Sequence, residues 1–250
     1  MASSNHAALR HFLDRLLRRS PLSAEEQQAI LNLRSHAVQA RARRDIVSPG
    51  HAVDHACLVV DGLVARFDQL SDGRRQIVAF YIRGDMCDLH SVPVPVAGWG
   101  LEALTTTTLL HVAHAELWRL AKAYPAIALA FWRDTTADAS IFAKWTSNIG
   151  RRDAQSRLAH LFCEMGFRAE EAGLGRRTDF PFEATQNQLA DALGLTSVHV
   201  NRMMQALRKQ GVVRTEGRMV HVEDWNRLAF IAEFDPDYLL LRHPERAAAA

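Results

Sequence analysis

The chain has 250 residues, of which 48% are hydrophobic and 23% are charged, a composition typical of folded globular proteins. Its formal net charge of +2 argues against a protein that binds nucleic acid over a broadly basic surface. No apolar run approaches the length of roughly 18 residues that a membrane span needs, and the N-terminus lacks a signal-peptide core. We therefore expect a cytoplasmic protein without a membrane partner.

Two helices are predicted at the N-terminus. Residues 7–19 place five apolar side chains on one side and four arginines elsewhere, namely Leu9, Phe12, Leu13, Leu16 and Leu17 against Arg10, Arg15, Arg18 and Arg19. We expect this helix to dock on the next domain; a membrane-surface helix is the alternative. The second helix is predicted from Ser23 to Arg34, with Ser23 and Glu26 as a capping box.

The pattern changes to short strands between Asp45 and His114. Residues 57–67 alternate around an Asp-Gly turn, and residues 71–74 form a second tight turn that leads into a strand over 76–82. Residues 101–112, with four consecutive threonines, are strongly strand-prone. Short strands separated by glycine-containing turns at this spacing predict a small antiparallel barrel or roll.

A helical pattern resumes near Ala115 and, after Pro125, continues to about Ile149. The long segment carries apolar residues that suit a dimerisation helix, although Asp134 and Asp138 interrupt its heptad seam. The apolar residues are Ile127, Phe131, Ile141, Phe142, Trp145 and Ile149. Gly150 is expected to break the helix, and another helix is predicted from Asp153 to Gly166, followed by a loop over 170–178.

The most informative stretch is 185–211, TQNQLADALGLTSVHVNRMMQALRKQG. Leu189, Ala192 and Leu193 recur at helical spacing, Gly194 stops this first helix, and Leu195 is expected at the corner. Thr196 offers an N-cap to a second helix. At about 100° per residue, that helix places Val200, Met203, Met204 and Leu207 on an inward face, opposite a polar and mildly basic one. The pattern predicts a helix-turn-helix that lies in a DNA major groove.

The residues after Gly211 add a wing. Residues 212–222 alternate as two strands around a Gly-containing turn, with Arg214 and Arg218 able to reach a phosphate. Residues 185–222 contain five basic residues against Asp191 and Glu216, a local excess of three positive charges. Positive charge is therefore predicted to be concentrated on one DNA-binding surface.

The order of these segments resembles that of the Crp/Fnr family of bacterial transcription regulators. Residues 194–213, GLTSVHVNRMMQALRKQGVV, are similar to the family's recognition helix, and LVVDGLVARF followed by IVAFYIRGDM is similar to the strands and Gly-Asp corner of its β-roll. The resemblance covers about residues 25–230. It implies an α+β fold with an N-terminal cyclic-nucleotide-binding-like antiparallel β-roll, a long dimerisation helix and a C-terminal winged helix-turn-helix.

The domains expected on this basis are a β-roll with flanking helices over 1–124, the dimerisation helix over 125–149, the DNA-binding domain over 150–235 and a C-terminal tail over 236–250. The resemblance implies a homodimer on a pseudo-palindromic double-stranded operator, with half-sites about one helical turn apart. RNA polymerase is expected as a further partner.

Individual DNA contacts follow from the same resemblance. Arg202 occupies the place of the family's guanine-reading arginine and can bond O6 and N7. Ser197 and Val198 stand where relatives place an arginine or small residue followed by a glutamate; Val198 cannot accept from cytosine but can touch a thymine methyl. The remaining expected contacts to bases or phosphates are Thr185, Gln186, Thr196, His199, Asn201, Gln205, Lys209, Arg214 and Arg218.

The residues that could bind an effector are fewer and lie in the predicted β-roll. A possible effector pocket consists of Asp85, Cys87, Asp88, His90 and Trp99. Family members that bind cyclic AMP use a Gly-Glu pair and an Arg-Ser pair, whereas this chain has no arginine between Arg83 and Arg119. The guanidinium clamp for a phosphate is therefore missing, and the two aspartates would repel an anion. Control by cyclic AMP is not expected.

Metal and cofactor sites are not expected either. Cys57, Cys87 and Cys163 form no CxxC pair, so each is expected to be a small buried hydrophobic residue, although a redox role for Cys87 stays open. The iron–sulfur mechanism of the family's oxygen sensors needs clustered N-terminal cysteines, which are missing here. The pairs His51/His55 and His111/His114 lack a third ligand on one helix and are expected to be surface histidines.

Alternatives remain for the function. The β-roll could sense haem, a redox state or another small ligand, or it could need no effector. The winged helix could instead be a protein-interaction module. An enzyme is disfavoured because the sequence shows no nucleophile–base pair, metal cluster or phosphate-binding motif.

Overall fold

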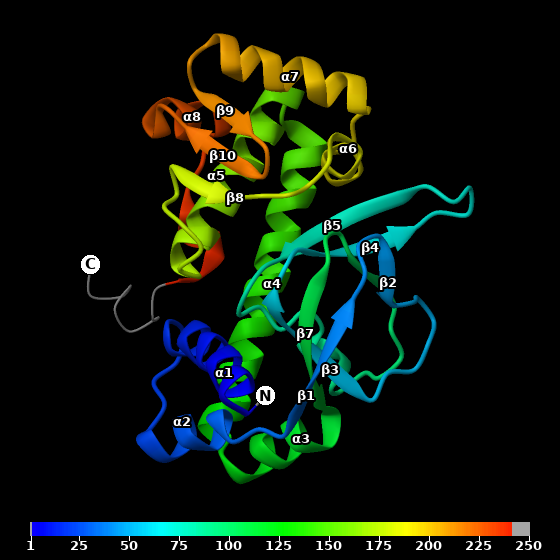
Figure 1. Ribbon diagram of the computed structural model, residues 1–250, viewed down its shortest axis with the longest axis vertical. Helices are drawn as coiled ribbons and strands as arrows, with labels where there is room; N and C mark the ends of the chain where they lie inside the picture. Colours follow the sequence, from blue (N-terminus) through cyan, green and yellow to red (C-terminus); the bar gives the residue numbers. More distant parts are fainter. Residues whose placement is uncertain (1, 242–250) are drawn as a thin grey trace. The chain divides into compact units, whose positions relative to one another are not determined.

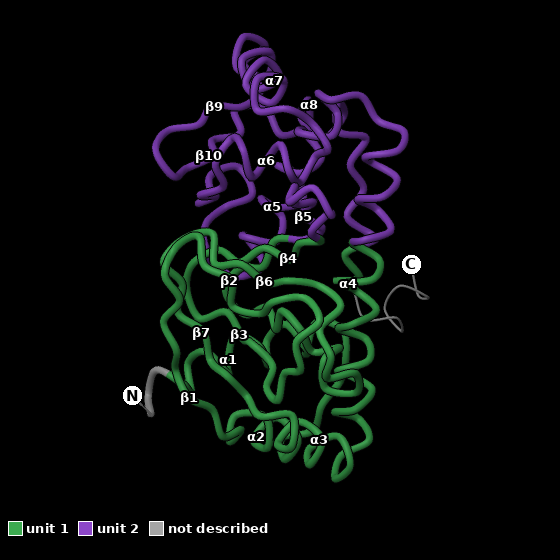
Figure 2. The backbone as a smooth tube through the Cα atoms, turned by 90° about the vertical axis from the view of Figure 1, so that its right-hand side faces the viewer, with its two compact units in different colours: residues 1–68, 80–141, 239–250 green, residues 69–79, 142–238 purple. Residues whose placement is uncertain are grey.

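The computed structural model describes residues 2–241, with the side chains described from residue 5 onward (Figure 1). The chain forms two compact units (Figure 2). Unit 1 comprises residues 1–68, 80–141 and 239–250, and unit 2 comprises residues 69–79 and 142–238. The division falls within the long helix instead of at either of its predicted ends. Most of the predicted C-terminal tail, from residue 242, lies outside the described residues.

Two antiparallel sheets form the β-roll, as the sequence predicts. One has the strand order β1-β7-β3 and the other β2-β6-β4-β5. The strands are β1 (Ser35–Ala40), β2 (Arg44–Val47), β3 (His55–Asp61), β4 (Val64–Gln69), β5 (Arg75–Tyr81), β6 (Gly100–Ala103) and β7 (Thr107–Ala113). A short 3-10 helix, η1 (Leu89–Ser91), lies between β5 and β6 in the chain.

The Asp-Gly turn predicted within 57–67 is present between β3 and β4, which belong to different sheets. Gly62 turns the chain from one sheet to the other at φ +99°, and a Cβ there would lie 2.6 Å from Oγ1 of Thr107. Only glycine fits this turn. The strand-prone run 101–112 likewise divides into β6 and β7, which also lie in different sheets.

Helices α1 (Ala2–Leu17), α2 (Ala24–Leu31) and α3 (His114–Ala123) belong to unit 1. α1 begins five residues before its predicted start and packs against β1, β3 and α2. Its apolar face joins Leu58, Leu110 and Val112 in one core, so the prediction that it docks on the β-roll is confirmed. The capping box of α2 is also present, with Ser23 and Glu26 bonded reciprocally.

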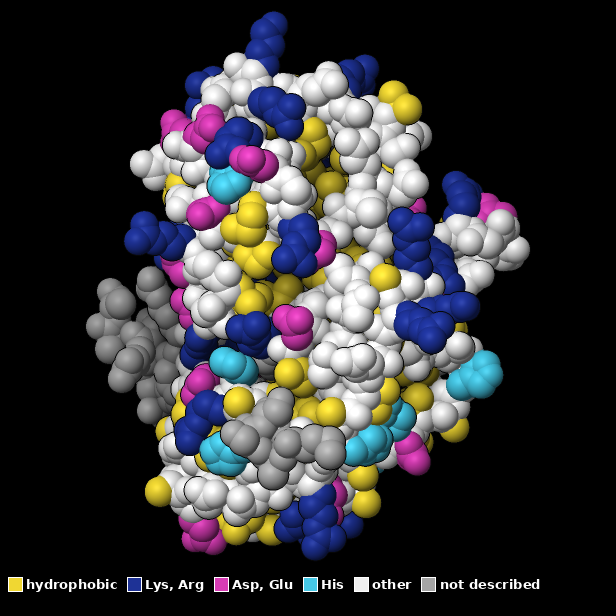
Figure 3. Space-filling view, viewed as in Figure 1, with side chains coloured by type: hydrophobic (Ala, Val, Ile, Leu, Met, Phe, Trp, Pro, Cys, Tyr) yellow, Lys and Arg dark blue, Asp and Glu magenta, His cyan; other side chains and the backbone are white. Residues whose placement is uncertain are grey.

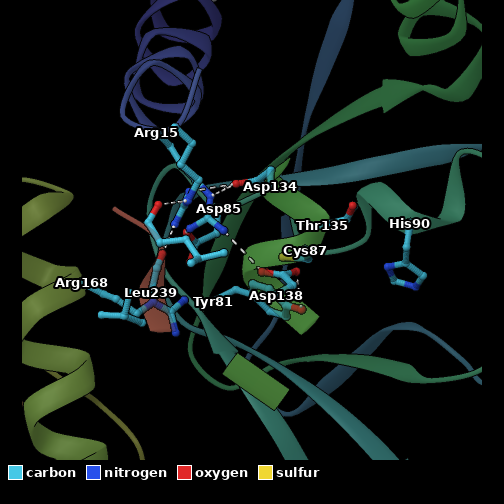
Figure 4. A network of polar contacts seen from close by, with 12 residues as sticks. Arg15, Tyr81, Asp85, Cys87, His90, Asp134, Thr135, Asp138, Arg168 and Leu239 are labelled. Carbon is cyan, nitrogen blue, oxygen red and sulfur yellow. Dashed lines mark hydrogen bonds and ion pairs between the residues drawn. The ribbon is translucent and has the colours of Figure 1, made fainter. Parts of the chain in front are cut away.

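On the basic side of α1, half-buried Arg15 and buried Arg19 belong to an ion-pair network. Figure 4 shows Arg15 reaching the carboxylates of Asp85 and Asp134; its Nη1 lies 2.5 Å from Asp85 and its Nε 2.7 Å from Asp134. Arg19 adds a 3.1 Å contact to Asp134 and donates to the carbonyls of residues 239 and 240. Asp134 therefore occupies a position in the apolar pattern of the long helix because its carboxylate pairs with the arginines of α1.

The long helix α4 (Pro125–Arg151) is confirmed, but its predicted seam is wrong. Ile127, Phe131, Ile141 and Trp145 are buried within the protomer. A different stripe is exposed, and it follows heptad spacing: Leu129, Trp132, Thr136, Ala139 and Ala143. Gly150 does not break α4, which ends only where Asp153 caps the next helix.

Unit 2 contains the predicted helix-turn-helix and wing. Its elements are α5 (Ala154–Glu171), β8 (Asp179–Pro181), α6 (Gln186–Leu193), α7 (Ser197–Lys209), β9 (Val213–Glu216), β10 (Met219–Val222), α8 (Trp225–Ala232) and most of the 3-10 helix η2 (Pro236–Leu239). α5 runs past its expected end at Gly166, where a Cβ would lie 2.6 Å from the carbonyl oxygen of Arg177. That glycine permits close packing and does not terminate the helix.

Candidate DNA-binding surface

The geometry of the helix-turn-helix is fixed by caps at both ends of the turn. Thr185 begins α6 through a capping box with Gln188. Gly194 ends α6 in the left-handed conformation, with φ +63°, which glycine adopts without strain. Thr196 then accepts a hydrogen bond from the backbone N–H of His199 and starts α7. The stop at Gly194 and the cap at Thr196 were predicted, whereas the capping box at Thr185 was not; together they set the direction in which α7 leaves the turn.

The two faces of α7 divide as expected. Val200 and Leu207 are fully buried, and Met203 and Met204 are half-buried. α5 packs against both α6 and α7, which anchors this inward face. The opposite face presents the predicted contacts, with Arg202, Gln205 and Lys209 exposed and Ser197, His199 and Asn201 half-buried.

Val198 is an exposed apolar residue on the outer face of α7. Its side chain is 79% exposed, although burying a valine is worth roughly 1.5–3 kcal/mol. An exposed valine at the start of this helix therefore has no packing role within the protomer. It is free to make an apolar contact with a thymine methyl.

The wing is confirmed as β9 and β10, with β8 as a third strand in the order β8-β10-β9. Its arginines are paired with carboxylates, however. Arg214 contacts Glu216 and lies 3.5 Å from Glu223, and Arg218 lies 3.1 Å from Glu183. Two of these acids lie just outside residues 185–222, so the local excess of positive charge over 183–223 is smaller than the sequence window indicates.

The basic residues of α7 are in a different situation. Among the described residues, no carboxylate forms an ion pair with Arg202, Arg208 or Lys209. Figure 3 shows Lys and Arg side chains projecting at the end of unit 2 that carries α7. Arg208 is exposed and was not among the predicted DNA contacts. Its position in the last turn of α7, beside Lys209, could have indicated a phosphate contact.

The two aspartates among the five candidate effector residues of unit 1 have separate partners. Asp85 pairs with Arg15 and accepts from the backbone N–H of Ile82, whereas Asp88 accepts from the backbone N–H of Cys57. Cys87 is fully buried and Trp99 is 46% exposed. In Figure 4, His90 lies apart from the carboxylates around Arg15. The structure places these residues around the β-roll without directing them at one point.

Arg66 is an interior cation that was not predicted from the sequence; it comes from β4, before the segment between Arg83 and Arg119 that contains no arginine. It is 3% exposed. Its Nη2 contacts the carbonyl of Cys87 and lies 3.1 Å from Nδ1 of His90, and its guanidinium stacks over the Tyr81 ring. Burial, followed by the charge of Arg66, lowers the pKa of His90 to about 4, so His90 is neutral at physiological pH.

The cysteine predictions are confirmed, since Cys57, Cys87 and Cys163 are all buried and free. Burial, with smaller contributions from Asp88 and Asp85, raises the pKa of the Cys87 thiol. A buried, protonated thiol is a poor redox nucleophile. The buried surroundings of Cys87 therefore weigh against the redox role that the sequence left open.

The two histidine pairs do not form as their spacing suggested. His114 is buried and lies 2.8 Å from Oγ of Ser91, while His51 is exposed and lies 3.3 Å from the carbonyl oxygen of Pro49. The rings of His55 and His111 are instead stacked with their centroids 3.8 Å apart. Burial lowers the pKa of His111 to about 4, and His55 and His36 contribute. The expectation of surface histidines is therefore wrong for His111 and His114.

No helix within residues 2–241 has both the length and the apolar character that a membrane crossing requires.

Comparisons with known proteins agree with this architecture. Residues 156–231 match the family model of the Crp-like helix-turn-helix domain. The chain is 27% identical over 199 residues to the nitrogen fixation regulation protein FixK of Azorhizobium caulinodans, with 76% of each chain covered. It is 25% identical over 218 residues to the transcriptional activator protein FnrL of Cereibacter sphaeroides, with 85% of this chain and 86% of FnrL covered.

A solved structure supports the same relationship. FixK2 from Bradyrhizobium japonicum superimposes with a TM-score of 0.73 at 27% identity, covering 80% of this chain and 98% of FixK2. The similarity thus extends beyond the matched helix-turn-helix domain.

Proposed function

We propose that the chain is a transcriptional regulator of the Crp/Fnr family that binds a pseudo-palindromic DNA operator as a homodimer, without control by cyclic AMP. The observation that carries the proposal is the outer face of α7. That face combines short polar residues with basic side chains that have no acidic partner among the described residues, on a helix whose opposite face is anchored in the core.

Base recognition is assigned to the N-terminal half of α7. Arg202 is exposed and can donate two hydrogen bonds to O6 and N7 of guanine, while Val198 can touch a thymine methyl. Gln205 donates to Oδ1 of Asn201 at 3.0 Å, so the two amides act as one oriented group that can read adenine. Arg208, Lys209 and the wing arginines are assigned to phosphates, which position the helix without reading sequence.

Dimerisation is assigned to the exposed stripe of α4. Trp132 is 72% exposed and Leu129 is 42% exposed, and together with Thr136, Ala139 and Ala143 they follow heptad spacing. Small residues beside a large aromatic side chain suit helix-to-helix packing across a two-fold axis. Two recognition helices related by that axis would contact half-sites about one helical turn apart.

The interior of the β-roll supports the proposal that cyclic AMP is not the signal. The cation available there, Arg66, is already packed on Tyr81 and bonded to Cys87. A ligand phosphate would have to displace these contacts and approach Asp88, which is 4% exposed. FnrL is named a transcriptional activator, which favours RNA polymerase as a second partner of this chain.

The test is selection of bound fragments from random DNA by the purified full-length protein, followed by binding titrations at several salt concentrations. The proposal predicts an enriched motif with two-fold symmetry, an affinity that falls steeply with salt, and no change on adding cyclic AMP. Binding that is equal for all sequences would contradict operator recognition. Tighter binding in the presence of cyclic AMP would contradict the proposed lack of control.

A further inference from the structure

The β1-β7-β3 sheet brings together metal-binding side chains that are far apart in the sequence. The register pairs His111 of β7 with His36 of β1 on one side and with Cys57 of β3 on the other. His55 lies two residues before Cys57, and side chains two residues apart in a strand share a face of the sheet. Three strands thus place three histidines and one cysteine on the same face. Figure 3 shows histidine side chains gathered near these strands.

Three of these residues are close enough to share one ion. A ring nitrogen of His55, Sγ of Cys57 and a ring nitrogen of His111 all lie within 4.8 Å of one another. In a tetrahedral zinc site, bonds of about 2.0–2.3 Å place the ligand atoms roughly 3.3–3.8 Å apart. Small rotations of two half-buried rings would therefore close the site. His36 lies outside this set, with its ring edge-on to that of His111 at 5.2 Å.

The polar groups around the three residues favour a cation. Nε2 of His111 is buried and has no hydrogen-bond partner among the described residues, an arrangement that is uncommon for a buried polar atom. Nδ1 of His55 lies 2.8 Å from Oδ1 of Asp54. A carboxylate that holds one ring nitrogen in this way orients the other toward a metal.

A second carboxylate lies beside Cys57. Asp88 accepts from the backbone N–H of Cys57 at 2.7 Å, and its side chain interacts with the thiol. Its other oxygen, Oδ2, is buried and has no partner among the described residues. A buried carboxylate without full pairing is costly, and a bound cation would supply the missing charge.

The donor types select the class of ion. Two imidazole nitrogens and one thiolate sulfur suit borderline and soft first-row metals, whereas magnesium and calcium prefer oxygen ligands. Three protein ligands would leave a position for the Asp88 carboxylate or for a solvent molecule. As the ion binds, the Cys57 thiol releases its proton to solvent and the sulfur donates an electron pair to the metal.

We propose that His55, Cys57 and His111 form a binding site for a divalent transition-metal ion of the zinc type in the β-roll. The site was not expected from the sequence, because spacing along the chain pairs His51 with His55 and His111 with His114. The sheet instead joins one member of each pair, His55 and His111, to Cys57, which lies on the same strand as His55 and opposite His111. The proposal does not depend on DNA binding, and its failure would leave the proposed function unaffected.

The experiment uses the full-length protein, stripped with a chelator, kept reduced and titrated with Co²⁺ alone. Cobalt bound by a thiolate gives a charge-transfer absorption in the near ultraviolet, together with visible bands of a tetrahedral ion. We expect both in the unaltered protein and competition by Zn²⁺, with no competition by Mg²⁺. Absence of the thiolate band in the folded protein would overturn the proposal.

Variants locate the ligands. Cys57→Ser is expected to abolish the thiolate band, and His55→Ala and His111→Ala to weaken Co²⁺ binding by at least about tenfold. His51→Ala, an exposed histidine of the same unit, and Cys163→Ser, a buried cysteine of unit 2, are matched controls that keep the band. Cys87→Ser tests the neighbouring thiol; a band lost there and kept in Cys57→Ser would overturn the assignment.

Folding is checked by circular dichroism and thermal unfolding for every variant. If Cys57→Ser does not fold, His55→Ala still decides the question, because the His55 ring is partly exposed and its removal leaves no closed cavity. Unchanged Co²⁺ affinity in a folded His55→Ala protein would contradict the proposed ligand set.

Discussion

Arg202 and Arg218 carry the same charge in unit 2 but lie in different surroundings. Arg202 is exposed on α7 and has no carboxylate partner among residues 5–241, whereas Arg218 lies 3.1 Å from Glu183. A guanidinium without an acidic partner can present both of its donor edges to a base. A paired one must first exchange its carboxylate for a phosphate, so we expect the two residues to contribute differently.

Arg202→Ala should weaken operator binding by about 1–3 kcal/mol and relax specificity at one base pair. The reason is the loss of a bidentate contact to a guanine. Binding titrations on operators substituted at each position measure both effects. The control is Arg227→Ala, which removes an exposed arginine from α8 in the same unit. An unchanged base preference in Arg202→Ala would exclude Arg202 as a base reader.

Arg218→Ala should weaken binding to the operator and to unrelated DNA by similar factors and reduce the salt slope by about 1, because a phosphate contact carries no sequence information. Glu183→Gln should act in the opposite direction, with a modest gain for all sequences, since it releases Arg218 from an exposed ion pair of little intrinsic stability. Titrations over a salt series measure both variants. A loss confined to the operator would contradict the phosphate assignment.

At the scale of single elements, α4 has two opposed faces with different roles. One face is buried within the protomer, and the other presents Leu129 and Trp132 to solvent. The aspartates that interrupt the sequence heptad lie on the inner side: Asp134 is buried, and Asp138 lies 3.4 Å from Nη2 of Arg15. The helix therefore binds α1 through charged groups and keeps its small and apolar stripe available for another molecule.

Trp132→Glu should convert the proposed dimer to a monomer, with the dissociation constant raised at least roughly thirtyfold, as expected for a tryptophan at the centre of an interface. Sedimentation velocity over a concentration series measures the change. Trp118→Glu on α3 is the matched control, since Trp118 is 43% exposed and lies off α4. A Trp132→Glu protein that remains dimeric would place the interface elsewhere.

The charged side of α4 makes stability depend on pH. Burial raises the pKa of Asp138 to about 6 from its ordinary value of 3.8; Arg15 opposes the shift and Asp134 adds to it. Between these pH values the folded protein holds a proton that the unfolded chain has lost. The favourable contribution of this carboxyl is therefore complete below about pH 4 and is lost as the pH rises through about 6.

Asp138→Asn removes this titration while keeping an oxygen that can accept from Tyr81, which lies 3.4 Å from the Asp138 carboxylate. The free energy of unfolding of the variant minus that of the unaltered protein should rise by about 1–3 kcal/mol when the pH is raised from 4.5 to 7.5. Urea unfolding at both pH values measures the gain, with the exposed Asp68→Asn as control. A stability difference that does not change with pH would contradict the shifted pKa.

At the scale of the whole molecule, operator recognition needs two copies of α7 held at a fixed spacing. An insertion of about five base pairs between the half-sites turns them to opposite sides of the duplex, since one helical turn is about 10.5 base pairs. We expect the affinity of the dimer to fall to nearly that of a single half-site. Binding titrations on the operator, on the extended operator and on a single half-site measure this change. Equal affinity for the operator and the extended operator would contradict a rigid two-fold dimer.

The sequence by itself determined the elements whose signals are local. The capping boxes at Ser23 and Thr185, the stop at Gly194 and the periodicity of α7 each arise from residues within a few positions of one another. Caps and amphipathic faces are set by that short-range chemistry. The winged helix-turn-helix, the antiparallel roll and the long helix could therefore be predicted from the chain alone.

Only the tertiary structure decided which distant residues meet. It separated β3 from β4 at Gly62, paired Arg15 with Asp85 and Asp134, and turned the predicted seam of α4 inward. It also joined His55 and His111 to Cys57 across two strands. Strand partners and buried ion pairs depend on contacts between residues tens of positions apart, and local spacing carries no record of them. The DNA-binding helix could be predicted from its own residues, whereas the candidate metal site depends on the register of a sheet.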